Sequence, residues 1–121
     1  MNVKISTILE AQPALEAFAR KDLSITTSFK VAKLIKAVNT ELEAYNEQRI
    51  KLLESIGSTL SEDGKQYQIP MDKRAEFAES MDQLVSIEVT VPDKINISGE
   101  KISISPDILL ALEAFVEIDE V

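Results

Sequence analysis

The apolar positions of this 121-residue chain change their spacing along the sequence, and these changes predict its elements. Residues 28–56 contain neither proline nor glycine, and Gly57 follows where a helix would end. Apolar side chains recur in this stretch at steps of three, four or seven, which is the spacing of one helix face. We therefore predict a long central helix over residues 28–56. Its seam comprises Val31, Ile35, Val38, Leu42, Tyr45, Arg49, Leu52 and Ile56, with Arg49 as the charged member.

A shorter helix is predicted before it, over residues 6–21. Thr7 and Glu10 fit a capping box, with Thr7 as the N-cap and Glu10 at the third helical position. Pro13 falls inside this stretch, so we expect one helix with an irregularity near the proline.

The second half of the chain mixes both periods. A short strand over residues 65–69 precedes Pro70 and a third helix over residues 71–85. Strict alternation then predicts two or three short antiparallel strands, around residues 87–91, 95–97 and 102–104. Ser105, Pro106 and Asp107 form a strong helix start, and residues 108–118 are apolar nearly all round, which predicts a buried last helix.

These elements predict an α+β fold with about four helices and a small antiparallel sheet in the C-terminal third. The length favours a single domain over residues 1–121. The central helix would be about 42 Å long, whereas the expected radius of gyration is about 14 Å. Either the other helices lie along it, or a second chain does, so its seam is a core seam or an oligomer seam.

The composition excludes many kinds of active site. The chain has no cysteine and no histidine, so it has no disulfide, no Cys or His zinc ligand, no cysteine nucleophile and no histidine base. Its three glycines are far apart, which excludes a phosphate-binding glycine loop. We therefore expect a non-enzymatic protein with no cofactor and no dedicated metal site.

The net charge of −8 is unevenly distributed. Residues 1–60 carry 8 basic and 7 acidic side chains, and residues 61–121 carry 5 basic and 14 acidic ones. Within the acidic half, Asp72, Glu76 and Glu79 share one face of the third predicted helix. This acidic stripe is either a solvated face that keeps the protein soluble or a surface that faces a partner.

Basic side chains gather instead around the start of the long helix. They are Arg20, Lys21, Lys30, Lys33 and Lys36. Cations are mildly unfavourable at the positive end of a helix dipole, which makes their placement notable. Three interpretations stay open: solvated lysines whose stems cover apolar surface, ion pairs with the acidic half, or binding of an anionic ligand or partner. Nucleic acid is the least favoured such ligand, because the chain is acidic and no aromatic residues are interleaved with the lysines.

No run of 18 apolar residues is present, so no membrane span is expected, and the N-terminal residues do not resemble a secretory signal. We expect a cytoplasmic location.

Three segments, in this order, resemble a group of small uncharacterised proteins of tailed phages and prophages. They are residues 9–15 (LEAQPAL), 29–34 (FKVAKL) and 104–109 (ISPDIL). The resemblance spans most of the chain, but its motifs are helix starts and packing positions and assign no functional residue. It implies a phage protein that acts in the bacterial cytoplasm or is built into a virion.

The preferred expectation is an acidic phage accessory protein that binds a protein partner, for example to inhibit a host enzyme or defence factor. One alternative is a virion component or a tail or head assembly protein. Another is a binder of a small anionic ligand, such as a nucleotide, through the basic residues. Self-association through the long helix is compatible with each of these functions.

Overall fold

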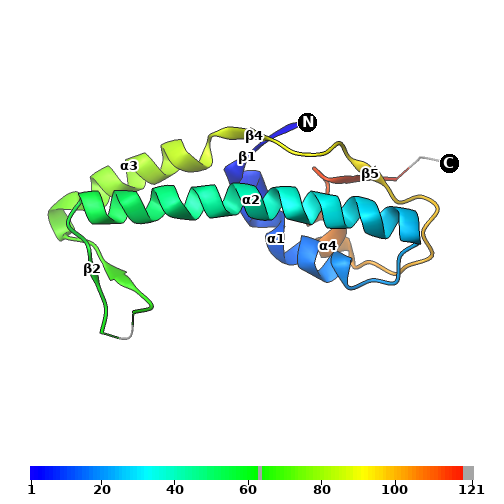
Figure 1. Cartoon of the computed structure of the whole chain (residues 1–121), viewed down its shortest axis with the longest axis horizontal. Coiled ribbons are helices and arrows are strands. Elements are labelled where there is room, and N and C mark those ends of the chain that lie inside the picture. Colours follow the sequence, from blue (N-terminus) through cyan, green and yellow to red (C-terminus); the bar gives the residue numbers. More distant parts are fainter. Residues whose placement is uncertain (63, 119–121) are drawn as a thin grey trace.

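One long helix, α2 (Ile25–Ser55), runs along the molecule, and the other elements are arranged beside it (Figure 1). The computed structural model describes residues 1–62 and 64–118. Helices α1 (Ile5–Ala19) and α3 (Arg74–Val85) both pack against α2, and α4 (Pro106–Ala111) packs against α1. The α+β class, the four helices and the long central helix are confirmed. Helices α1 and α3 of the same chain lie along α2, which is one of the two arrangements that its predicted length allows.

The main hydrophobic core lies between α1, the first half of α2 and the C-terminal segments. Its fully buried side chains include Ile8 and Phe18 of α1, Leu34 of α2, and Leu112 and Phe115 near the C-terminus. The predicted seam of α2 supplies the α2 side of this core: Val31, Val38 and Leu42 are buried in it, and Ile35 and Tyr45 pack against it. Five of the eight seam residues thus contribute to a core within one chain.

Helix α1 starts earlier than predicted and without a side-chain cap. Strand β1 (Asn2–Lys4) leads directly into it, so the helix begins at Ile5 and the predicted N-cap role of Thr7 is wrong. The Ile5 amide donates instead to the Ile87 carbonyl, at 3.0 Å. A backbone group distant in sequence thus does what a capping side chain would do.

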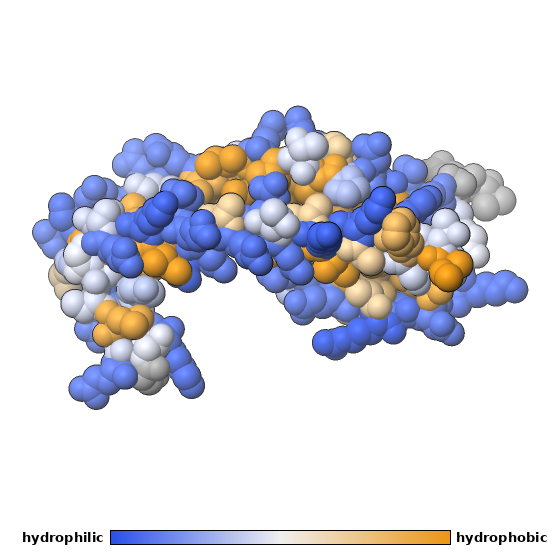
Figure 2. Space-filling view, in the orientation of Figure 1, coloured by the Kyte–Doolittle hydropathy of each residue, from blue (hydrophilic) through white to orange (hydrophobic). Residues whose placement is uncertain are grey.

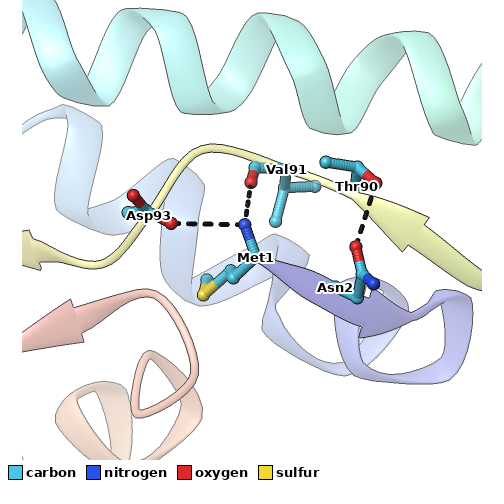
Figure 3. A network of polar contacts seen from close by, with 5 residues as sticks. All are labelled: Met1, Asn2, Thr90, Val91 and Asp93. Carbon is cyan, nitrogen blue, oxygen red and sulfur yellow. Dashed lines mark hydrogen bonds and ion pairs between the residues drawn. The ribbon is translucent and has the colours of Figure 1, made fainter.

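Strand β1 pairs antiparallel with β4 (Glu88–Thr90), in a register that sets Val3 opposite Val89. The amino group of Met1 extends this contact, donating to the Val91 carbonyl at 2.8 Å and lying 3.3 Å from an Asp93 carboxylate oxygen (Figure 3). The Thr90 hydroxyl donates to the Asn2 side-chain oxygen beside it. The predicted strand at residues 87–91 is thus confirmed, but its partner is the start of the chain.

A hairpin follows α2. Gly57 has a φ of +79°, which suits the left-handed position after a helix, as predicted. Strands β2 (Thr59–Leu60) and β3 (Tyr67–Gln68) pair antiparallel and extend away from the helices (Figure 1). A short 3₁₀ turn, η1 (Met71–Lys73), then leads into α3, so the predicted strand and third helix are both present.

The C-terminal segment departs from the prediction of a helix over residues 108–118. Helix α4 ends at Ala111, and the chain turns to form β6 (Val116–Glu117), which pairs in parallel with β5 (Ile95–Asn96). The Ile95 amide donates to the Phe115 carbonyl at 2.9 Å, and the Ile97 amide donates to the Glu117 carbonyl at 3.0 Å. An apolar run without periodicity fits a buried strand as well as a buried helix, which explains the error. Within residues 1–62 and 64–118, residues 102–104, predicted as a strand, pair with no other strand.

Candidate functional site

An open groove follows the first half of α2, where the end of α1 and the connection after it lie beside the helix. Its volume is about 640 Å³. Its apolar side comes from Leu23, Val31 and Ile35, and its polar rim includes Lys36 and Glu43. The other lining residues are Ala19, Ser28, Ala32, Asn39 and Thr40. A hollow with an apolar floor and a charged rim fits a segment that is apolar on one side and polar on the other.

Beside this groove, large apolar side chains stand in solvent. Ile25 is 88% exposed and Phe29 is 61% exposed. The Lys33 ammonium lies over the Phe29 ring, 4.8 Å from its centre, which holds the ring at the surface by a cation–π contact. Figure 2 shows apolar side chains at the surface where α2 begins. The sequence pattern does not single out these two residues, because residue 25 lies before the predicted helix over residues 28–56 and residue 29 does not belong to its seam.

Both residues belong to the side of α2 that faces away from the core, which we call the outer face. Its members are spaced by three or four residues along the helix, and every one is exposed. They are Ile25, Phe29, Ala32, Lys36, Asn39, Glu43, Glu47, Ile50 and Glu54. The signal that could have identified this face in the sequence is the pair of apolar residues, 25 and 29, spaced by four and offset from the seam.

The predicted basic residues gather at this end of the molecule, but they do not converge on one point. Arg20, Lys30, Lys33 and Lys36 are exposed, and Lys21 is half-buried. Lysines spaced by three residues progress around a helix by about 60° at each step, so the three on α2 wind around it. They form a basic collar around the start of α2, in which Lys36 lies on the groove rim.

The N-terminus of α2 is occupied by a carboxylate of the same chain. Glu100 accepts hydrogen bonds from the Ser24 amide at 3.0 Å and from the Ser24 hydroxyl at 2.6 Å. The Ser24 hydroxyl oxygen also accepts from the Thr27 amide at 3.4 Å, as an N-cap does. The hydrogen bond from the Ser24 side chain, with a second from Thr27, lowers the pKa of Glu100 below its usual range. The positive end of this helix thus interacts with Glu100, and an external anion would have to compete with it.

The acidic stripe lies on the outside of η1 and α3. Asp72, Glu76 and Glu79 are all exposed, and the Lys73 ammonium lies 3.5 Å from a Glu76 carboxylate oxygen. Lys73 therefore neutralises part of the stripe. Among residues 1–62 and 64–118, no group of three or more carboxylates is arranged to hold a metal ion.

A second hollow, of about 610 Å³, lies at the other end of α2. The hairpin residues Leu60 and Tyr67 line it together with Ile50 of α2 and Phe77 of α3. Leu60 is 53% exposed and Ile50 is 37% exposed, so apolar surface is accessible here too. The outer face of α2 therefore connects two partly apolar hollows.

The remaining seam residues continue toward this hollow. Ile56 is buried, while Arg49 and Leu52 are half-buried, and Arg49 lines the second hollow.

In the part of the chain that the structure describes, no helix is both long and apolar enough to cross a bilayer. Comparison of the chain with family models, with curated proteins and with solved structures gave no match.

Proposed function

We propose that this chain is a non-enzymatic binding protein that docks onto another protein through the outer face of α2 and the groove beside it. One observation carries the proposal: Ile25 and Phe29, both largely exposed, stand next to an open groove with an apolar floor. Burial of a side chain of this size contributes about 1.5–3 kcal/mol, so covering both would supply a substantial part of a binding free energy.

The charges around the groove favour a particular kind of segment. Lys33 and Lys36 follow Phe29 along the helix, so a docked segment that carries acidic side chains beside its apolar ones would be complementary there. An amphipathic helix offers this combination. The resemblance to tailed-phage proteins suggests an accessory role, with the partner being a host or phage protein, in the cytoplasm or in a virion.

The proposal is tested by immobilising the full chain and comparing the proteins retained by three forms of it. Phe29→Ser removes the exposed ring from the outer face, and Leu110→Ser removes another apolar side chain, 70% exposed, from α4. A partner of the outer face is retained by the wild type and by Leu110→Ser, and is lost from Phe29→Ser. If all three forms retain the same proteins in the same amounts, free copies of the chain included, the outer face is not the docking surface.

A second docking surface is suggested by the exposed acidic stripe of η1 and α3. Its three carboxylates lie away from the groove, so a basic surface of a partner could meet them while the outer face of α2 is occupied. Reversal of all three charges, in Asp72→Lys, Glu76→Lys and Glu79→Lys combined, then lowers the affinity for that partner and reduces the salt dependence of binding. Unchanged binding of every partner would leave the stripe as a solvated face.

A further inference from the structure

The charges of α2 divide the helix into two halves of opposite sign. Its first half, residues 25–40, holds Lys30, Lys33 and Lys36 and no acidic residue. Its second half, residues 41–55, holds four glutamates and two basic residues. On the outer face itself the only cation is Lys36, and it is followed by the anions Glu43, Glu47 and Glu54. A partner helix that fits this face must reverse this order of charges along its length.

The outer face of a second copy of α2, laid antiparallel, has that reversed order. If a twofold axis passes between Asn39 and Thr40, a residue of one copy lies opposite a residue of the other copy when their two residue numbers add to 79. Lys36 of one copy then lies opposite Glu43 of the other, and the same pair forms again across the axis. Ala32, a small residue, lies opposite Glu47, which leaves room for that carboxylate to reach Lys33. A parallel pair would instead place like charges together.

The same axis pairs two of the three exposed large apolar residues of the outer face, Phe29 and Ile50, and places the third, Ile25, opposite Glu54. Phe29 of one copy lies opposite Ile50 of the other, and these positions are separated by about 32 Å along a single helix. Ile50 borders the second hollow, with Leu60 and Tyr67 beside it. One end of the outer face therefore presents an exposed ring, the other end presents a hollow of about 610 Å³, and the twofold axis brings each ring to the partner's hollow.

We propose that the partner of the outer face of α2 is a second copy of this chain, bound antiparallel in a symmetric dimer. This inference rests on the proposed function, since it names the occupant of the same docking surface. A twofold interface uses one patch on both subunits and therefore needs a patch complementary to itself. The charge order and the pairing of Phe29 with Ile50 meet this condition.

Charge reversal with rescue tests the proposal, by sedimentation over a range of concentrations. The wild type is expected to sediment at twice the chain mass. Lys36→Glu sets carboxylates opposite carboxylates at two places, and Glu43→Lys sets ammonium groups opposite each other. Each variant alone is expected to dimerise about tenfold more weakly or worse. An equimolar mixture of the two restores both attractive pairs and therefore restores the dimer.

Matched controls carry the same charge changes elsewhere: Lys94→Glu between β4 and β5, and Glu16→Lys on α1, both at exposed positions outside the outer face. These are expected to dimerise as the wild type does, and their mixture shows no rescue. A dimer that responds to the controls as strongly as to Lys36→Glu and Glu43→Lys would overturn the proposal. So would a wild type that remains a monomer at every concentration. If such a monomer still retains another protein in a Phe29-dependent way, the docking proposal stands and only its occupant is wrong.

Disulfide trapping tests the direction of the pair. The chain has no cysteine, so introduced thiols have no competitors. Asn39→Cys and Thr40→Cys lie opposite each other across the proposed axis, and a mixture of the two should form a disulfide-linked pair on mild oxidation. A mixture of Asn39→Cys and Glu16→Cys should not form a disulfide-linked pair under the same oxidation. Failure of the first mixture to cross-link, in a protein that does dimerise, would place the dimer contact elsewhere.

Discussion

The two ends of α2 are packed very differently, although one uninterrupted helix joins them. At the core end, residues 1–42 and 91–118, buried side chains from α1, α2, the segment after α4 and β5–β6 form a continuous hydrophobic core. At the hairpin end, residues 43–62 and 64–90, only Leu53 and Ile56 are buried, and α3 has no buried residue. A continuous helix thus does not imply uniform stability: most of the apolar burial lies at one end.

The functional features follow the same division. The groove and the exposed residues Ile25 and Phe29 lie on the core end, where the backbone beneath them is held firmly. The second hollow lies on the hairpin end, where few buried contacts fix its walls. In the proposed dimer, each rigid end would bind the less constrained end of the other copy, so association would order the hairpin end.

The largest effect is expected from removal of a ring at the centre of the core end. Phe18 is 1% exposed, so Phe18→Ala loses its transfer free energy and leaves a cavity, at a cost of about 3–5 kcal/mol. The total stability of a domain this size is about 5–15 kcal/mol, so the variant should lose at least about a fifth of it and unfold at a much lower denaturant concentration. Chemical denaturation followed by circular dichroism measures the loss. A loss below about 1 kcal/mol would show that the core end is not where stability resides.

A smaller and more local effect is expected from Leu53→Ala. Leu53 is 2% exposed at the hairpin end, and the substitution should cost about 2 kcal/mol or more. Because the burial there is separate from the main core, hydrogen exchange should accelerate in α3 and in the second half of α2 while the amides of α1 keep their protection. Equal acceleration in α1 and α3 would mean that the two ends unfold as one unit.

The core end was also the harder end to predict from the sequence, although it is the better packed. The seam of α2, its glycine stop, the short strand before Pro70 and the third helix could all be predicted because each depends on local spacing or on a turn residue. Strand β1, the pairing of β5 with β6 and the uncapped start of α1 could not. They depend on backbone groups 20 or more residues apart, such as the Ile5 amide and the Ile87 carbonyl, which no local pattern encodes.

The candidate site could be predicted only in part, for a related reason. The basic residues near the start of α2 were identified from their charge, and the seam from its period. The exposed residues Ile25 and Phe29 could not be predicted, because two apolar residues outside the seam give no clear signal until the buried face of the helix is known. The contact of Glu100 with Ser24 joins residues 76 positions apart and has no signature in the sequence.

Gly57 allows a test at the junction between α2 and the hairpin. Its φ of +79° disfavours any residue with a Cβ, and no atom beyond its two chain neighbours lies within 4 Å of where that Cβ would be. Gly57→Ala should therefore cost about 1–2 kcal/mol through the backbone alone. Hydrogen exchange should show the loss in the hairpin and α3 and not in α1. A stability equal to that of the wild type would mean that the junction can rearrange without penalty.

The smallest effect concerns Glu100, whose contact with Ser24 joins the segment before α4 to the start of α2. Because the pKa of Glu100 is lowered in the folded protein, its contribution is fully present above the ordinary carboxyl pKa and disappears as the pH falls through the lowered value. The Ser24 amide resonance should therefore shift in an acid titration, with a midpoint below that of an ordinary glutamate. Glu100→Gln retains an acceptor oxygen but does not titrate, so the Ser24 amide resonance of this variant should stay constant across the same pH range.

Ser24→Ala removes the cap as well and should lower the free energy of unfolding by about 1 kcal/mol, more than Glu100→Gln does. If the Ser24 amide resonance shifts with pH identically in Glu100→Gln and in the wild type, another group causes the shift. The contact between Glu100 and Ser24 then does not join the segment before α4 to the start of α2.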